Sequence, residues 1–262
     1  MIHPSAIIDP EAELDPSVEV GPFAVIEAGV RLGAGCAVGP HVHLLGPALI
    51  GAGNRFHTGA VIGDAPQDLA YTPAPTGLVI GDQNVFREHV TVHRSSSVGE
   101  ETRIGSHCFL MAHSHVGHNC RLGDRVIMAN GATLGGYVEL HDRAFISGNC
   151  LVHQFVRVGQ MALMQGGSAI SKDLPPCTIA RGDNGIAGLN VVGMRRAGLS
   201  AEERLELRRL YHAMVLGIGS LAERLEAAEP LVRSEWGRVF VGFFRSSRRG
   251  CVSPRREARA GA

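Results

Sequence analysis

The chain has 262 residues, and its 25 basic and 25 acidic side chains cancel, so its charge does not predict general binding to nucleic acid. No apolar stretch approaches the roughly 18–20 residues needed to cross a bilayer, and the N-terminus lacks the pattern of a secretory signal. We therefore expect a soluble, cytoplasmic protein without a membrane span. A content of 34 glycines favours a β-rich fold with many tight corners.

An apolar residue recurs every six positions along most of the chain. The first run extends from Ile8 to Ile62, and the second keeps the same phase from Ile80 through Val98 to Ile170. This period does not fit a helix, whereas hexapeptide repeats build parallel β-helices whose units are buried by stacking. The pattern resembles that of left-handed β-helix acyltransferases, in which three hexads form one triangular coil. It predicts an all-β, left-handed parallel β-helix in which residues three hexads apart lie on successive coils.

The repeat is interrupted between Ile62 and Ile80. The stretch in between contains three prolines and few apolar residues, and Asp68 stands where an inward apolar residue belongs. We therefore expect a loop at about 63–79 to leave the β-helix, which we place at residues 1–188. Loops on rigid scaffolds often carry function, and we expect the same of this loop.

A C-terminal α-helical domain is expected at 189–250. Ser200 and Ser220 each begin a capping box with a glutamate three residues later. Apolar residues follow both boxes at helical spacing, which is the pattern of amphipathic helices. The final segment, 251–262, is rich in charged and small residues, and we expect it to be disordered.

A cluster of histidines lies in the segment MAHSHVGHNC at 111–120. His118 follows the inward Val116 by two positions, and the equivalent positions on the next two coils are Gly136 and Gln154. One outer face would therefore carry a base, a backbone N–H with no side chain beside it, and an amide. Acyl transfer requires such parts, because a base takes the proton of the attacking hydroxyl and a backbone donor stabilises the oxyanion.

Two other interpretations of the histidines stay open on the sequence alone. The spacing of His113 and His118 resembles part of the zinc-ligand set of γ-class carbonic anhydrases, which share the β-helix. Zinc would need at least one further protein ligand and an open coordination position, which a neighbouring subunit could supply. A purely structural role is the other interpretation, since outward polar residues are common on exposed faces.

Six motifs occur in order along the chain: QDLAY at 67–71, VTVHR at 90–94, AHSHVGHNC at 112–120, ANGATLGG at 129–136, VHQF at 152–155 and LNVVGMRRAGL at 189–199. Their combination resembles the UDP-N-acetylglucosamine O-acyltransferases, from the N-terminus to about Gly250. The resemblance implies transfer of a 3-hydroxyacyl chain from acyl carrier protein to the glucosamine 3-hydroxyl, the first step of lipid A synthesis in Gram-negative bacteria. It also implies a homotrimer with active sites between subunits and no metal or organic cofactor.

The resemblance also implies roles for individual residues. His118 matches the general base, and Gly136 matches the residue whose backbone N–H stabilises the oxyanion. Positions that match substrate-binding residues are Gln67, Asp68, His115, Tyr137, His153, Gln154, Asn190 and Arg196. Gly166 matches a position near the far end of the acyl groove, where residue size influences chain length. The arginine-rich C-terminus would suit docking of the acidic carrier protein, although it is equally compatible with a solvated basic end.

Several positions depart from the usual residues of that family: a lysine, a histidine, a glutamate and an arginine are replaced by Ala70, Tyr137, Val192 and Ala197. Asn119 is not a carboxylate, so we expect it neither to orient the imidazole of His118 nor to balance its charge. The departures keep three alternatives open. They are a different acceptor (a 3-amino nucleotide sugar or another sugar), a non-catalytic trimeric protein that binds sugar nucleotides, and a zinc hydratase.

Overall fold

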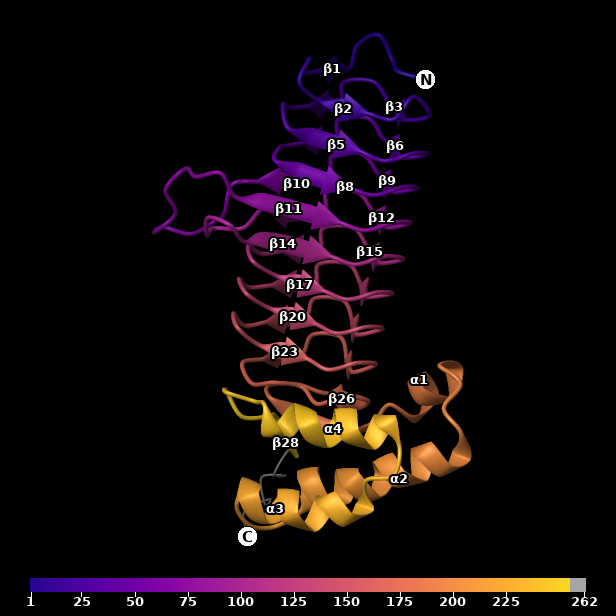
Figure 1. The fold of residues 1–262 in the computed structure, drawn as a ribbon, viewed down its shortest axis with the longest axis vertical. Coiled ribbons are helices and arrows are strands. Elements are labelled where there is room, and N and C mark those ends of the chain that lie inside the picture. Colours follow the sequence, from indigo (N-terminus) through magenta and orange to yellow (C-terminus); the bar gives the residue numbers. More distant parts are fainter. Residues whose placement is uncertain (255–262) are drawn as a thin grey trace.

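The computed structural model describes residues 1–254 and confirms the left-handed parallel β-helix, whose three sheets form the sides of a long prism (Figure 1). The first sheet consists of β1 (Ile7–Ile8), β4 (Val25–Ile26), β7 (His43–Leu44), β10 (Val61–Asp64), β13 (Thr91–His93), β16 (His115–Val116), β19 (Thr133–Leu134), β22 (Leu151–Val152) and β25 (Ala169–Ile170). The second consists of β2 (Glu13–Leu14), β5 (Val30–Leu32), β8 (Ala48–Ile50), β11 (Gly77–Ile80), β14 (Glu101–Ile104), β17 (Arg121–Leu122), β20 (Glu139–Leu140) and β23 (Arg157–Val158). The third consists of β3 (Glu19–Val20), β6 (Ala37–Val38), β9 (Arg55–Phe56), β12 (Val85–Phe86), β15 (Phe109–Leu110), β18 (Ile127–Met128), β21 (Phe145–Ile146), β24 (Leu163–Met164), β26 (Thr178–Ala180), β27 (Gly185–Leu189) and β28 (Ser253–Pro254).

Each short strand of the prism places one side chain in the core and the next one outside. Val116 on β16 and Leu134 on β19 are both 0% exposed, whereas their neighbours His115 and Thr133 are only partly covered. His115 pairs with Thr133, and Val116 pairs with Leu134. This register carries each hexad position up the prism, so equivalent side chains form columns one strand spacing apart.

The corner between the first and second sheets turns through two residues. The second residue of each turn has a left-handed backbone, with φ of 58° at Asn119, 59° at Tyr137 and 65° at Phe155. L-residues rarely adopt this conformation, and asparagine tolerates it better than aromatic residues do. The first residue of each turn, such as His118 or Gly136, needs no such backbone and lies at the edge of the first sheet.

A long excursion leaves the prism between β10 and β11. Its residues, 65–76, stand away from the coils (Figure 1). Ile62 and Ile80 lie on either side of it, and both are buried core residues on neighbouring sheets. The core therefore continues across the excursion without a missing layer.

A shorter excursion joins β13 to β14. The six-residue repeat did not predict it. Val92 pairs with Val116, 24 residues further on, whereas Ile104 pairs with Leu122, 18 residues further on. The corner thus holds six additional residues, which is the length of one repeat. The prediction that Val98 points inward is wrong, because Val98 lies in this excursion and is 70% exposed.

Helices cover the C-terminal end of the prism: α1 (Val191–Arg196), α2 (Ala201–Tyr211), the π-helical turn η1 (His212–Leu216), α3 (Leu221–Ala228), the 3-10 turn η2 (Glu229–Leu231) and α4 (Glu235–Arg245). Both predicted capping boxes are confirmed, at the start of α2 and α3. The α4 helix lies across the end of the prism, and α2 and α3 lie below it (Figure 1). No helix within residues 1–254 combines the length and apolar character required to span a bilayer.

The chain returns to the prism after α4. Val252 is 3% exposed, its N–H donates to the Asp173 carbonyl at 2.9 Å, and β28 pairs with β27. The disorder predicted for 251–262 therefore begins too early, because a buried valine and backbone hydrogen bonds hold residues 251–254. Residues 255–262 lie outside the described residues.

A buried ion pair fastens α4 to the last coils. The Asp173 carboxylate, with a side chain 2% exposed, accepts from Arg157 Nη2 at 2.9 Å and from Ser247 Oγ at 2.8 Å. The Arg157 guanidinium lies 4.6 Å from the centre of the Phe243 ring and donates to the Phe243 carbonyl. These contacts join the prism, α4 and the returning segment at one point.

We predict that Asp173→Ala lowers the free energy of unfolding by roughly 3–5 kcal/mol, because it leaves a mostly covered guanidinium without its counter-ion. Urea unfolding measures the change. Glu13→Ala is the matched control, since the Glu13–Arg31 pair has side chains 65% and 63% exposed and should contribute less than about 1 kcal/mol. Equal losses in the two variants would contradict the fastening role.

Candidate active site

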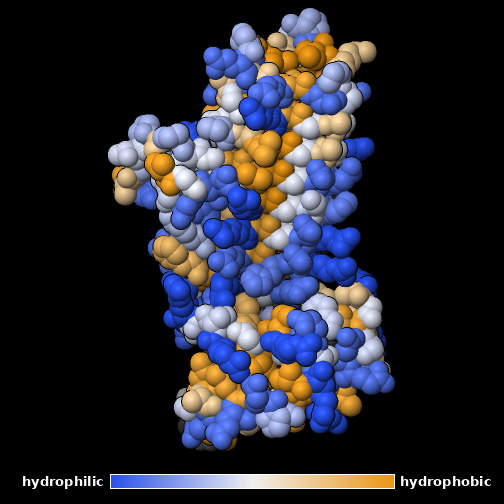
Figure 2. Space-filling model, in the orientation of Figure 1, coloured by the Kyte–Doolittle hydropathy of each residue, from blue (hydrophilic) through white to orange (hydrophobic). Residues whose placement is uncertain are grey.

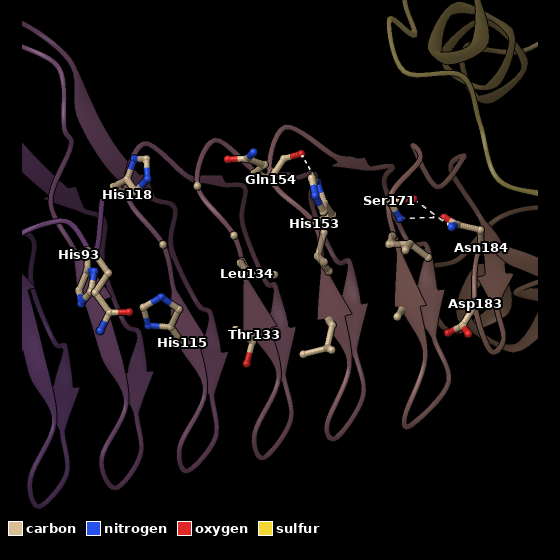
Figure 3. Close-up of a pocket in the computed structure, with 18 residues that line it drawn as sticks. His93, His115, His118, Thr133, Leu134, His153, Gln154, Ser171, Asp183 and Asn184 are labelled. Atoms are coloured by element: carbon tan, nitrogen blue, oxygen red, sulfur yellow. Dashed lines mark hydrogen bonds between the residues drawn. The ribbon is translucent and has the colours of Figure 1, made fainter. Parts of the chain in front are cut away.

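A groove of about 710 Å³ runs along the outer face of the first sheet, beside its corner with the second sheet. Figure 3 shows His93, His115 and His118 at one end of this outer groove, and Ser171 and Asn184 at the other. Its floor is the outward row of the first sheet, in the order His115, Thr133, Leu151, Ala169. The floor therefore changes from polar at the histidine end to apolar at the other end.

His118, Gly136 and Gln154 occupy the first position of three successive turns and all line the outer groove. We call this set the corner column. Its backbones are tied together, because Tyr137 N–H donates to the His118 carbonyl at 2.9 Å and Phe155 N–H donates to the Gly136 carbonyl at 3.0 Å. The strict register of the strands therefore places the three residues one above another.

The imidazole of His118 occupies the space above Gly136. A Cβ atom built on Gly136 would lie 2.5 Å from His118 Nε2 and 2.6 Å from Cε1, far inside contact distance. The φ of Gly136 is not in the left-handed region, so its glycine is required by space and not by backbone conformation. Within residues 1–254, the N–H of Gly136 has no protein acceptor. A base and a backbone donor that no protein group uses thus lie side by side in the groove.

Asn119 orients the imidazole of His118, so the expectation that it would not is wrong. Asn119 Oδ1 lies 2.8 Å from His118 Nδ1. A carbonyl oxygen only accepts hydrogen bonds, so Nδ1 carries a proton and the lone pair of the neutral ring is on Nε2, toward Gly136. The second half of the expectation holds, since an amide brings no charge to the contact.

His115 and His93 are neutral polar groups beside the base. His115 Nδ1 is hydrogen-bonded to Thr91 Oγ1 at 2.7 Å, and the His93 ring lies edge-on to His115 with centres 4.9 Å apart. Burial lowers the pKa of His115 to about 4, and the neighbouring charges of His93 and His118 act in the same direction. Burial also lowers the pKa of His93, although Asp64 opposes that shift. Near neutral pH both rings can exchange hydrogen bonds with hydroxyl groups.

We predict that His115 makes the protein less stable in acid. Its folded pKa lies below the unfolded value of 6.5, so the unfolded chain binds the proton more readily, and stability is lost as pH falls from 6.5 toward 4. At about pH 5 this loss amounts to about 2 kcal/mol. Urea unfolding near neutral pH and near pH 5 should show a larger loss for the native protein than for His115→Gln. An equal loss would show that His115 titrates normally; His113→Gln, at an exposed corner, should behave like the native protein.

Several residues that line the groove were not predicted from the sequence. His93 is 4% exposed, and its Nδ1 has no partner among the described residues; its only sequence signal was its place in VTVHR. At the far end, Asn184 Oδ1 accepts from Ser171 N–H at 2.7 Å, and its Nδ2 donates to Ser171 Oγ at 3.0 Å (Figure 3). Ser171, Asp183 and Asn184 follow the last hexad, so the repeat could not place them.

Six of the predicted site residues line the outer groove: Gln67, His115, His118, Gly136, His153 and Gln154. The other predicted site residues do not line the outer groove. Tyr137 turns toward the second sheet, stacks on Phe155 with centres 5.0 Å apart and places its hydroxyl 3.1 Å from Ser97 Oγ. Gly166 lies at the corner between the third and first sheets, away from the groove.

Asp68, Asn190 and Arg196 also do not line the outer groove. Asp68 is exposed in the long excursion, where its carboxylate accepts from Ala70 N–H at 2.9 Å. Asn190 caps α1, accepting from Gly193 N–H at 2.9 Å and donating to the Met161 carbonyl at 2.9 Å. Both ends of its amide are used, so nucleotide contact by Asn190 stays a prediction. Arg196 is exposed at the end of α1.

The histidine pair that suggested zinc is divided between two corners. His113 lies before β16, where it stacks on His89 with centres 5.2 Å apart, and His118 lies after β16. Within residues 1–254, no group of three or more potential ligands is arranged to hold a metal ion. The spacing of these two histidines thus does not bring them to one point within a chain.

Known proteins resemble this chain in sequence. A family model described as UDP-N-acetylglucosamine O-acyltransferase, domain 2, matches residues 173–252, and one described as bacterial transferase hexapeptide matches residues 101–136. The acyl-[acyl-carrier-protein]–UDP-N-acetylglucosamine O-acyltransferase of Saccharophagus degradans is 44% identical over 75 residues, which are 29% of this chain and 29% of that protein. The Brucella ovis enzyme of the same name is 38% identical over 75 residues, 29% of this chain and 27% of that protein. These sequence matches thus span under a third of either relative.

Solved structures match over nearly the whole length. The UDP-N-acetylglucosamine acyltransferase of Francisella novicida superposes with a TM-score of 0.93 at 32% identity, covering 97% of this chain and 94% of that one. The acyltransferase from Bacteroides fragilis gives a TM-score of 0.93 at 36% identity, covering 96% of this chain and 100% of that one. Since identity above 30% extends over almost all of both chains, this protein belongs to the UDP-N-acetylglucosamine acyltransferase family.

Proposed function

We propose that this chain transfers a 3-hydroxyacyl group from acyl carrier protein to the 3-hydroxyl of UDP-N-acetylglucosamine, the first step of lipid A biosynthesis. The observation that carries the proposal is the position of His118 Nε2 directly above Gly136, whose N–H has no acceptor among the described residues. Family membership supports the same reaction. The reaction needs no metal or organic cofactor.

The corner column accounts for each step of the transfer. His118 Nε2 takes the proton of the sugar hydroxyl as its oxygen attacks the thioester carbonyl carbon and the new C–O bond forms. The Gly136 N–H donates to the oxygen that becomes negatively charged. The C–S bond then breaks, and the proton on His118 passes to the departing thiolate. Asn119 accepts from Nδ1–H throughout, so the ring does not need to turn between the steps.

The change in polarity along the groove floor determines which substrate lies at each end. Neutral His93 and His115, with Gln67 nearby, suit the hydroxyls of the sugar. Leu151 and Ala169 at the other end suit an acyl chain, and Leu151 is 55% exposed in the single chain. We place the sugar at the histidine end and the acyl chain along the apolar end. Gly166 stays a proposed determinant of chain length.

We further propose a homotrimer with active sites between subunits. Asp68, Arg196 and Gly166 lie outside the groove of their own chain, and a neighbouring chain is the means of bringing such residues to a substrate. The prism also exposes an apolar band (Figure 2), which suits a surface that packs against other copies. Exposed Arg248 and Arg249 suit the acidic carrier protein, and Arg249 Nε donates to the carbonyl of the groove residue Ser171 at 3.1 Å. A cytoplasmic location belongs to the same proposal.

The test is an acyl-transfer assay with 3-hydroxyacyl carrier proteins of graded chain length and UDP-N-acetylglucosamine as acceptor. We expect one chain length to be preferred and the product to carry an ester at the 3-position. An acceptor lacking the 3-hydroxyl is the control and should give no product. Absence of transfer at every chain length would reject the proposal, and a faster reaction with a 3-amino acceptor would reassign the acceptor.

A further inference from the structure

The short excursion 94–100 surrounds the amide of Asn119, which is 5% exposed. Its Oδ1 accepts from Ser96 N–H at 2.9 Å and from Ser96 Oγ at 2.9 Å, in addition to its contact with His118. Its Nδ2 donates to Ser95 Oγ at 2.7 Å and to Glu100 Oε2 at 2.9 Å. Every hydrogen-bonding atom of the amide is therefore occupied.

These partners allow only one orientation of the amide. A backbone N–H such as that of Ser96 can only donate, so the atom facing it must be the carbonyl oxygen. A carboxylate such as Glu100 can only accept, so the atom facing it must be the NH₂ group. If the amide were reversed, it would place like groups against both partners. His118 Nδ1 thus always meets an acceptor, which keeps the lone pair of the neutral ring on Nε2.

We infer that Asn119 and Glu100 form a positioning pair for the base: Asn119 holds the imidazole, and Glu100 holds the amide. This inference rests on the proposed function, in which His118 is the base. Glu100 does not contact His118, so it acts only through Asn119. The other charged or titratable groups around His118 are His93 and His115 in the groove and Tyr137, whose ring lies edge-on at 5.4 Å. None of them contacts Nδ1.

The six additional residues of the corner thus have a function. Without them the chain would pass directly from β13 to β14, as the next coils pass from β16 to β17. Ser95, Ser96 and Glu100 all belong to this insertion, and each bonds the Asn119 side chain. The insertion therefore supplies the hydrogen-bond partners that hold the Asn119 amide in one orientation.

The first test is Asn119→Ala, with Asn149→Ala as its matched control. Asn149 has the same turn position and a similar left-handed backbone (φ 54°), but it is exposed at a different corner. We expect Asn119→Ala to lower kcat by roughly 10–100-fold with little change in KM, the usual effect of losing a group that orients a reacting side chain. Asn149→Ala should leave both constants unchanged. An unchanged kcat in Asn119→Ala would overturn the inference.

The second test exchanges the charges of the pair. Asn119→Asp places a carboxylate against Glu100 and should lower the melting temperature, because two acceptors then face each other. It should also move the acidic limb of the pH–rate profile to higher pH, because a negative charge stabilises the imidazolium. The double variant Asn119→Asp/Glu100→Gln restores a donor to the contact, so it should recover the melting temperature and keep the shifted pH–rate profile.

Glu101→Gln is the control for the charge exchange, because Glu101 is the adjacent carboxylate but pairs with Arg103. It should not rescue Asn119→Asp. If Glu100→Gln rescues no better than Glu101→Gln, the coupling of Asn119 to Glu100 is absent and the inference fails. The His118 tautomer is read by NMR without substrate. A protein that transfers no acyl group but shows the Nδ1–H tautomer and the rescue would reject the proposed function and keep the positioning pair.

Discussion

Replacing His118 by alanine lowers kcat for acyl transfer by roughly 10²–10⁴, the range expected for the loss of a general base. No neighbouring histidine can take over the role. His115 Nδ1 is hydrogen-bonded to Thr91, and His93, edge-on beside His115, is only 4% exposed. His93 lies on β13 and His115 on β16, whereas Gly136 lies in the turn after β19. KM should change little, because His118 contacts the hydroxyl that reacts and not the body of the nucleotide.

The control for this prediction is His113→Ala. His113 belongs to the same cluster in the sequence but lies at the other end of β16, exposed at a different corner. It should keep its activity within about twofold, the scale of a surface change. The melting temperatures of both variants should match that of the native protein, since the His118 side chain is outside the core. A His118→Ala protein that unfolds, or one that retains full activity, would move His118 from catalysis to structure.

The strict period of the repeat made the corner column predictable. Once inward residues such as Val116 are identified, positions three hexads apart must stack, because neighbouring strands pair in parallel without a shift. His118, Gly136 and Gln154 could therefore be brought together from sequence alone. Their geometry at the corner, with the imidazole above the glycine, depends on a side-chain torsion that no repeat pattern reports.

The strict six-residue period is also the reason that the short excursion was not predicted. An insertion of six residues keeps the phase of a six-residue repeat, so Val98 looked like an inward residue and the corner at 94–100 looked regular. The role of Asn119 was misjudged for this reason. Its residue type suggested a weaker partner for His118 than a carboxylate. The direction of its amide is fixed by Ser96 and Glu100, and no pattern in the sequence predicts that these residues lie beside it.

The residues away from the groove illustrate a different limit. The resemblance associated Asp68, Asn190 and Arg196 with substrate, yet a repeat pattern relates only positions within one prism. Asp68 lies in the long excursion, and Asn190 and Arg196 lie at the two ends of α1. In the proposed homotrimer, their relation to the base depends on how copies of the chain pack together, and the hexad register of one chain does not specify that packing.

Gly136→Ala is the second prediction with a large effect, because the added methyl group would occupy the place of the base. Its Cβ would lie 2.5 Å from His118 Nε2, and the ring cannot move aside without losing the hydrogen bond to Asn119. We expect kcat to fall by roughly 10²-fold, the effect of displacing a reacting group by about an ångström. Gly148→Ala is the matched control, since Gly148 holds the same turn position at another corner and a Cβ there meets only Asn130 O at 3.4 Å.

The double variant His118→Ala/Gly136→Ala separates two explanations of that loss. If the methyl group acts by displacing the imidazole, it has no further effect once the imidazole is gone, and the double variant should retain the kcat of His118→Ala. If it acts by moving the Gly136 N–H away from the oxyanion, the two losses should multiply. Single-turnover rates of the four proteins distinguish the cases. Because alanine suits the backbone at Gly136, we expect the first result, in which glycine makes room for the base.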